Sequence, residues 1–348
     1  MTDYKNINDY KNINDKGLSG LQNIGNSCYI NACMQLLSHT HELNNLLDNL
    51  DQKKINNTID GTMIKEWDSL RKMLWSSNCT VAPLRFFKVI QIISKKKEIL
   101  EFSGFEQNDL QEFLIFIIDT FHNGLKREVN MNITGNKKTG MDELAIECYK
   151  MIQNMYKKEY SEILNIFYGI SVNQIKSLKT GDILSRNPEP FSILSLPIPC
   201  KSQSTILDCF DDFTKDEKLD GDNAWFNEKT KQKEDINKNI LFWNLPEVLI
   251  IVLKRYNNFN QKVKTLVTSD DIIDVSKYVC GYNAETYVYE LFGVGNHSGN
   301  SSGGHYTANI KYSDGNWYNI NDTMINKINS NIITPYTYCF FYRKKNNN

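Results

Sequence analysis

The sequence lacks the features that place a chain in a membrane or outside the cell. Its longest apolar runs, FLIFII and VLIIVL, are far shorter than the roughly 20 apolar residues that a membrane-spanning helix needs. The N-terminal segment MTDYKNINDYKNINDKG also lacks the basic start and apolar core of a secretory signal. We therefore expect a protein of the cytoplasm, with the nucleus as the alternative, and no membrane partner.

An excess of either charge is missing as well. The chain has 40 Lys and Arg residues against 41 Asp and Glu residues, which leaves a formal net charge of -1. A chain without a global basic field has no general attraction to nucleic acid or to anionic membranes. Any partner must be recognised by a local surface, and we expect no nucleic-acid partner.

Paired cysteines are the third absence. The eight cysteines are scattered along the chain without any C-x-x-C pair and without the regular spacing of a disulfide framework. In a chain without an export signal, such cysteines are reduced thiols. We expect most of them to be small core residues, which leaves the question of whether any one of them is reactive.

The first residues of the chain consist of a short polar repeat. The segment DYKNIN occurs twice in succession, at 3–8 and at 9–14. Because a copy so poor in apolar residues cannot form a core, it is not a solenoid repeat. We predict a flexible polar leader over 1–16 and a single domain over 17–345.

The pattern of apolar residues changes along that domain. Between about 26 and 125 they recur at helical spacing, whereas after 163 short β-branched and aromatic runs indicate strands. The charged stretch 209–239 between two such runs is interpreted as a solvated insertion. These patterns predict an α+β fold in which helices precede an antiparallel sheet system.

Cys28 stands in GLQNIGNSCYINACMQLL, between a glycine-containing polar turn and an apolar helix. Asn26 or Ser27 could cap this helix, and the positive end of the helix dipole would then lie near the sulfur and lower the pKa of the thiol. Asn23 could donate its amide to a developing oxyanion, although Asn in such a turn is usually a turn residue. A lone cysteine at a helix start is more often structural, and mid-helix Cys33 is expected in the core. The hypothesis of a nucleophile therefore needs a base.

His305 is the histidine whose surroundings suit a base. It follows a loop rich in glycine and serine, in NHSGNSSGGHYTANIKYSDGNWYNIND, and begins an alternating strand. Asn321 and Asp322 stand at the end of the next predicted strand, within reach of its second ring nitrogen if the two strands pair. Either could fix the tautomer, and we place that residue on the Nδ1 side. His297, within the loop, is the weaker candidate.

Several segments, in order, resemble the catalytic domain of the ubiquitin-specific proteases. GLQNIGNSCYINACMQLL is similar to the cysteine box of that family, and YELFGVGNHSGNSSGGHYTANIK with WYNINDTMI is similar to its histidine box. FSGFEQNDLQEFLIFIIDTFH, PFSILSLPIP and LPEVLIIVLKRY resemble the blocks between them. The resemblance implies a papain-like fold shaped as a right hand, with a helical thumb at about 17–160 and a β-rich palm and β fingers at about 161–345.

The resemblance also implies a role for each matching residue. Cys28 becomes the nucleophile, His305 the general base and acid, and Asn23 the oxyanion donor. Asn321 takes the usual third position of the triad and Asp322 the adjacent acidic one. The residues expected to bind the extended ubiquitin tail are Gln107, Asp109, Glu112, Gly303, Gly304 and Tyr306.

One departure from the family concerns zinc. Many members bind zinc in the fingers through two C-x-x-C pairs, and here the corresponding places hold Ser177 with Thr180 and Asn227 with Thr230. Hydroxyl and amide groups are poor zinc ligands compared with thiolate. We therefore expect no metal and no cofactor.

The function implied is that of a thiol isopeptidase that hydrolyses the bond after the last glycine of ubiquitin through a thioester. Its expected partners are ubiquitin and ubiquitinated proteins, and we expect a monomer. Two alternatives remain: an inactive ubiquitin-binding scaffold, and a protease for another ubiquitin-like modifier.

Overall fold

The first half of the chain is helical. The structure, a computed structural model, describes residues 16–345, so the predicted repeat at 3–14 lies outside the described residues. The helices are α1 (Cys28–Ser38), α2 (His41–Asp48), α3 (Ile59–Leu74), α4 (Leu84–Lys96), α5 (Leu110–Leu125), α6 (Gly140–Glu159), α7 (Glu162–Phe167) and, later in the chain, α8 (Ile206–Thr214). In the described residues no helix is long and apolar enough to cross a membrane.

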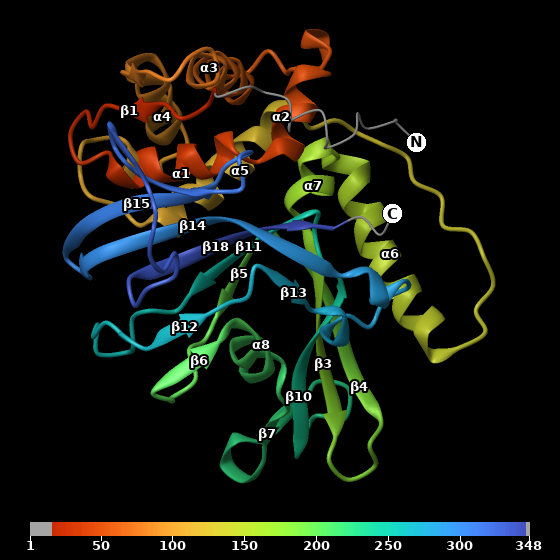
Figure 1. Cartoon of the computed structure of the whole chain (residues 1–348). Helices are drawn as coiled ribbons and strands as arrows, with labels where there is room; N and C mark the ends of the chain where they lie inside the picture. The colour runs from red at the N-terminus through yellow and green to blue at the C-terminus, as the bar shows by residue number, and fades with distance from the viewer. Residues whose placement is uncertain (1–15, 346–348) are drawn as a thin grey trace.

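The second half of the chain forms a central sheet that lies below α1 and α5 in Figure 1. Its strand order is β17-β16-β15-β14-β18-β11-β5, and β13 pairs with β14 as well. The strands are β5 (Ile193–Leu196), β11 (Val248–Leu253), β13 (Ile272–Asp274), β14 (Val288–Asn300), β15 (Gly303–Lys311), β16 (Trp317–Asn321), β17 (Met324–Lys327) and β18 (Thr337–Lys344). Helices followed by strands are what the sequence predicts, and the α+β class is confirmed.

A second sheet projects away from the central one, toward the bottom of Figure 1. Its order is β4-β3-β10-β7, with β3 (Gly169–Ser177), β4 (Ile183–Phe191), β7 (Glu217–Leu219) and β10 (Ile236–Asn244). Three two-stranded pairs complete the strands: β1 (Gly20–Leu21) with β2 (Thr80–Val81), β6 (Gln203–Thr205) with β12 (Leu266–Thr268), and β8 (Trp225–Asn227) with β9 (Gln232–Glu234). This sheet occupies the place predicted for the fingers, whereas the predicted boundaries of thumb, palm and fingers stay a prediction.

The stretch 209–239, which was interpreted as a solvated insertion, is exposed over most of its length but is ordered. The stretch forms the end of α8, the strands β7, β8 and β9 and the start of β10. Cys209, Phe210 and Ile236 within it are fully buried. Its many charges lie on short elements that bury only a few apolar residues, and Phe226 within it is 51% exposed, so composition alone concealed the ordered structure.

Helix α1 is buried along its whole length between the other helices and the central sheet. The helix approaches β14 closely at Gly293, where a Cβ would lie 2.8 Å from Cδ2 of Leu36. At Gly295 a Cβ would lie 2.5 Å from Sγ of Cys339 on the neighbouring strand β18. Gly293 therefore allows the close packing of α1 on the sheet, and Gly295 allows the packing of the Cys339 side chain.

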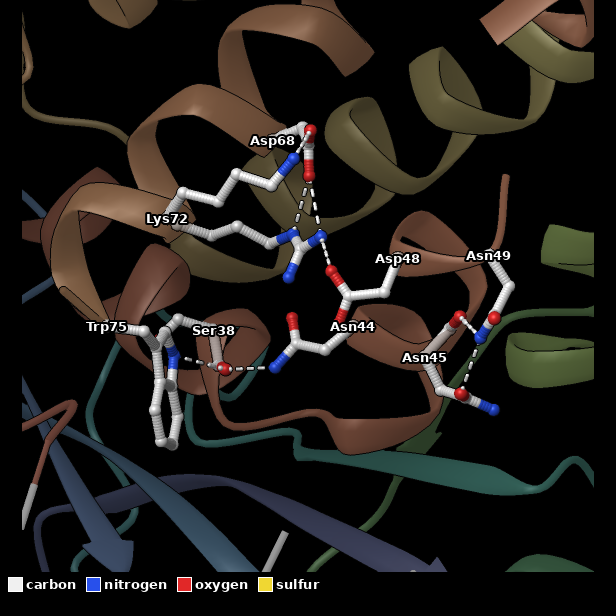
Figure 2. A network of polar contacts seen from close by, with 9 residues as sticks. Ser38, Asn44, Asn45, Asp48, Asn49, Asp68, Lys72 and Trp75 are labelled. Carbon is white, nitrogen blue, oxygen red and sulfur yellow. Dashed lines mark hydrogen bonds and ion pairs between the residues drawn. The ribbon is translucent and has the colours of Figure 1, made fainter. Parts of the chain in front are cut away.

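Polar contacts hold the far end of α1 (Figure 2). The carbonyl oxygen of Ser38 accepts hydrogen bonds from Nδ2 of Asn44 at 2.7 Å and from Nε1 of Trp75 at 3.1 Å. Arg71 of α3, buried beside α2, donates to Asp48 and Asp68. These bonds satisfy a terminal carbonyl of the helix and join α1, α2 and α3 into one support for the residue at the other end of α1.

Candidate active site

Cys28 is the first residue of α1 and is 4% exposed. Burial raises the pKa of its thiol; a backbone hydrogen bond from Tyr306 of β15 opposes this rise, and the nearby Asp322 carboxylate adds to it. The predicted lowering of the thiol pKa was therefore wrong for the free site, because desolvation of the sulfur outweighs the donors around it. The contact with the Tyr306 backbone nevertheless places the sulfur against the strand that carries His305.

The turn before Cys28 is held by Asn23. Its Oδ1 accepts from the backbone N–H of Gly25 at 3.2 Å and of Ser27 at 3.1 Å, and its Nδ2 donates to Oδ2 of Asp322 at 3.0 Å. Ser27 is the N-cap residue, but its side chain makes no capping bond and its Oγ accepts from the N–H of Ile24 at 2.9 Å instead. Both side chains thus stabilise the turn and leave the first N–H groups of α1 without a side-chain cap.

His305 and Asn321 lie side by side on β15 and β16. The strands pair antiparallel with Ala308 opposite Ile320, and Nε2 of His305 lies 2.6 Å from Oδ1 of Asn321. Because an amide oxygen can only accept, Nε2 carries the proton and Nδ1 is the nitrogen left to act as a base. The orienting residue was expected on the Nδ1 side, and that assignment was wrong.

Asp322 has a different task from Asn321. Its Oδ1 accepts from Nδ2 of Asn31 at 2.7 Å, its Oδ2 accepts from Asn23, and its backbone oxygen accepts from the N–H of Leu21 at 2.8 Å. Among the described contacts of Asp322, none reaches His305. The sequence left open which of the two neighbours orients His305, and the structure gives them different contacts. Asn321 bonds the histidine, and Asp322 joins the cysteine turn and α1 to the end of β16.

A cavity of about 260 Å³ opens beside Cys28. We call it the tail cleft, because its lining includes every residue predicted to bind an extended ubiquitin tail: Gln107, Asp109, Glu112, Gly303, Gly304 and Tyr306. A Cβ on Gly303 would lie 2.6 Å from Oε1 of Gln107, and one on Gly304 would lie 2.3 Å from Nε2 of His297. A Cβ on Gly304 would also lie 2.3 Å from the backbone oxygen of Ser298, so glycine is a steric requirement there, whereas a side chain at Gly303 would displace the end of the Gln107 side chain.

The acidic residues of the tail cleft are engaged unequally. Asp109 caps α5 through bonds from the N–H groups of Gln111 and Glu112. Its Oδ2 accepts from the hydroxyls of Tyr306 at 3.2 Å and Tyr338 at 2.7 Å. Glu112 is exposed, and partial burial together with the Asp109 and Glu101 carboxylates raises its pKa. Asp109 therefore joins α5 to β15 and β18 across the cleft, whereas the Glu112 carboxylate is exposed to solvent.

His297 is a site residue that the sequence analysis undervalued. It belongs to β14, is 5% exposed, stacks on Tyr306 with ring centroids 4.4 Å apart, and lines the tail cleft. Its Nδ1 lies 3.2 Å from both Tyr256 Oη and Lys262 Nζ. Burial, followed by the Lys262 charge, lowers the pKa of His297 to about 4, so the ring is neutral near pH 7. The one available signal was the strand alternation before it, which the glycines and serines after it obscured.

The positions compared with zinc ligands form turns. Oγ of Ser177 accepts from the N–H of Thr180 at 3.3 Å, and Oδ1 of Asn227 accepts from the N–H of Lys229 at 2.9 Å. In residues 16–345 no group of three or more His, Cys, Asp or Glu side chains is placed to hold a metal ion. The two turns therefore close through side-chain to backbone hydrogen bonds.

Comparison with known proteins gives consistent matches over the whole chain. The family model described as ubiquitin carboxyl-terminal hydrolase matches residues 19–342. The chain is 30% identical over 356 residues to ubiquitin carboxyl-terminal hydrolase Usp2 of Drosophila melanogaster, covering 98% of this chain and 36% of that protein. It is 30% identical over 342 residues to ubiquitin carboxyl-terminal hydrolase 2 of Homo sapiens, covering 94% and 55%. The chain thus spans between about a third and just over half of the length of these relatives.

Solved structures match the fold. A SAGA DUB module of Ubp8, Sgf11, Sus1 and Sgf73 bound to monoubiquitin contains a chain that is similar at a TM-score of 0.72 with 22% identity, covering 96% of this chain and 70% of that one. The same module bound to ubiquitin aldehyde matches at a TM-score of 0.72 with 23% identity, covering 96% and 71%. These likenesses confirm the predicted fold class.

Proposed function

Since the chain belongs to the ubiquitin carboxyl-terminal hydrolase family, we propose that it is a thiol isopeptidase that hydrolyses the amide bond after the last glycine of ubiquitin. The observation that carries the proposal is the alignment of the site. The Cys28 sulfur lies against the backbone of Tyr306, and the neighbouring His305 is held by Asn321 through Nε2. These two contacts support Cys28 as the nucleophile, His305 as the base and Asn321 as the orienting residue of acyl transfer from an amide.

The first step transfers a proton and forms a bond. Nδ1 of His305 takes the proton of the Cys28 thiol, and the sulfur attacks the carbonyl carbon of the terminal glycine of ubiquitin. The raised thiol pKa means that the free site holds a thiol, so the proton leaves as the substrate enters. The tetrahedral oxyanion accepts hydrogen bonds from the Cys28 N–H and from the amide of Asn23, whose Nδ2 carries a second hydrogen beyond the one given to Asp322.

The second half of the reaction returns the proton. The His305 imidazolium protonates the lysine amine as the C–N bond breaks, which leaves ubiquitin as a thioester on Cys28. His305 then takes a proton from water, the water oxygen attacks the thioester, and the thiol leaves with the proton. Gln107, Asp109, Glu112 and the glycine wall of the tail cleft would hold the ubiquitin tail extended during both steps.

Ubiquitin and ubiquitinated proteins are the partners that this activity requires, and we propose a monomer that acts in the cytoplasm or the nucleus. All eight cysteines are free, including the exposed Cys79 and Cys200, which supports a reducing compartment. The proposed mechanism uses side chains and one backbone N–H of this chain together with a water molecule.

The proposal is tested by covalent capture with propargyl probes of ubiquitin and of ubiquitin-like modifiers in parallel. We expect the ubiquitin probe alone to label the wild type. Cys28→Ala should abolish labelling and keep ubiquitin binding, whereas the matched variant Cys33→Ala, at a fully buried position, should retain labelling. Labelling by another modifier only would favour a different protease, and binding without labelling would favour an inactive scaffold.

A further inference from the structure

His305 stands between two hollows on opposite faces of β15. Successive side chains of a strand point to opposite faces, and Tyr306 accordingly lines the tail cleft together with Cys28. His305 and Thr307 line a second hollow of about 410 Å³, which we call the polar pocket. The imidazole therefore borders a space that is separate from the cleft proposed for the ubiquitin tail.

The floor of the polar pocket is one face of three neighbouring strands. Each side chain of that face that lines the pocket is polar: Asn296, Ser298, His305, Thr307, Asn309 and Asn319. The opposite face of β15 carries Ala308 and Ile310, which are fully buried in the core. The part of this face that lines the pocket runs from the exposed Ser298 to the buried Asn309 and offers hydrogen-bonding groups.

Hydrogen bonds fix this floor and join it to its rim. Nδ2 of Asn319 donates to Oδ1 of Asn309 at 2.7 Å, and Nδ2 of Asn309 donates to the carbonyl oxygen of Ile332 at 2.9 Å. Ile332 belongs to the segment between β17 and β18, and residues of this segment together with the end of β17 form the rim of the pocket. Floor and rim thus form a preorganised surface, which lowers the cost of binding a partner.

The charge of the polar pocket has one sign. Lys327, an exposed residue at the end of β17, is the one Lys or Arg among its lining residues, and no Asp or Glu lines it. Asp314, on the turn between β15 and β16, accepts hydrogen bonds from Asn316 and Tyr318 outside the pocket, and its carboxylate also lies within electrostatic reach of Lys327. A carboxylate on a bound peptide would be attracted by Lys327, and a basic side chain would be repelled.

We propose that the polar pocket binds the leaving polypeptide around its acceptor lysine and selects polar or acidic residues next to that lysine. This inference rests on the proposed function. His305 has to protonate the lysine amine, so the lysine must end beside the imidazole, while the ubiquitin tail occupies the other face of β15. The chain on either side of the lysine then lies over the polar pocket, where its amides meet the asparagine floor and its acidic side chains meet Lys327.

The test compares substrates that share ubiquitin and differ only in the leaving group. Ubiquitin is joined to the single lysine of short peptides with Asp, Asn or Arg residues beside that lysine, and kcat/KM is measured for each. A fluorogenic aryl amide of ubiquitin, which has no leaving polypeptide, provides the reference rate for every variant. We expect the wild type to favour the Asp peptide over the Arg peptide by about five-fold, and this ratio to shrink at high salt.

Two variants and one control test whether the polar pocket produces the preference between the peptides. Lys327→Glu should invert the ratio between the Asp and Arg peptides, whereas Lys65→Glu, the same charge change on the exposed face of α3, should leave the ratio as it is. Ser330→Trp narrows the rim and should lower the rate on all three peptides relative to the aryl amide. A wild type that does not cleave the aryl amide would overturn the proposed function. Cleavage of the amide with equal rates on the peptides, unchanged by Lys327→Glu, would overturn this inference alone.

Discussion

At His305 the choice of ring nitrogen determines how a change at Asn321 acts. Asn321 holds Nε2 with a neutral amide at 2.6 Å, and a carboxylate in the same place would stabilise the imidazolium. Asn321→Asp should therefore move the acidic limb of the kcat/KM profile, along which His305 loses its proton and becomes a base, to higher pH and retain activity. Asn321→Ala should lose roughly ten-fold or more, in the range found for positioned acid-base groups. The measurement is the pH profile on a fluorogenic ubiquitin amide.

A charge control separates this effect from general electrostatics. Ser313→Asp adds the same charge on the exposed turn between β15 and β16 and should leave the limb in place. An unmoved limb in Asn321→Asp, combined with a limb moved to lower pH in Asp322→Asn, would transfer the orienting role to Asp322.

Asp322 also affects the nucleophile itself. Its carboxylate raises the pKa of the buried Cys28 thiol because a negative charge disfavours the thiolate. In Asp322→Asn this contribution disappears, the thiol pKa falls, and alkylation of Cys28 by iodoacetamide should begin at lower pH than in the wild type. The rate of alkylation against pH, followed by mass spectrometry of the Cys28 peptide, gives the result. Alkylation of Cys28 that begins at higher pH in Asp322→Asn than in the wild type would contradict this account of the site.

Among the elements, the turns of the fingers lead to a prediction about metal. The turns at Ser177 and Asn227 close through bonds to backbone N–H groups, and none of the four positions compared with family ligands offers a thiolate. The purified protein should contain no stoichiometric zinc by elemental analysis, and EDTA should leave its Tm unchanged. One zinc per chain, or a Tm lowered by the chelator, would show that other side chains form a metal site.

The elements also show what local sequence can predict. The order of helices and strands follows from periodicity, and Cys28, His305 and Asn321 each stand in a distinctive local motif. Strand order could not be predicted, because β18 pairs with β14 and β11, which lie far away in the sequence. The burial of His297 escaped prediction for the same reason, since Lys262, which bonds it, comes from a distant segment.

The sequence also did not predict the ordered elements of the charge-rich stretch 209–239 or the protonation of Cys28. In 209–239 the buried residues are few and are separated by charged ones, so the periodicity that indicates a strand or helix is weak. The thiol pKa of Cys28 depends on burial by distant segments and on Asp322, which are tertiary contacts. A helix start therefore predicted the position of the sulfur and not its protonation state.

For the whole molecule, buried neutral histidines make stability depend on pH. His39 is 3% exposed, and burial lowers its pKa to about 4, with the Gln35 carbonyl opposing and the Arg343 charge adding to the shift. The unfolded chain takes up this proton near pH 6.5, so the folded state loses stability as the pH falls from about 6.5 to 4. Between pH 7 and 5 this residue alone should cost about 2 kcal/mol of the free energy of unfolding.

Urea unfolding at pH 7 and at pH 5 checks that figure. His39→Gln removes the titrating group, so the loss between the two pH values should be smaller than in the wild type by about 2 kcal/mol. Gln52→His adds a histidine at an exposed position, where the folded and unfolded chains titrate alike, and should leave the loss unchanged. An equal loss in all three proteins would rule out His39 as the source.

The place of β18 in the central sheet has a consequence for biosynthesis. This strand, Thr337–Lys344, lies between β14 and β11, so the sheet remains in two parts until residues near the C-terminal end have left the ribosome. Cys28 emerges early in translation and His305 late, and the frame that brings them together closes last. A growing chain on the ribosome therefore carries Cys28 for most of its synthesis without the completed sheet, and the proposed nucleophile and base share one frame only after β18 has emerged.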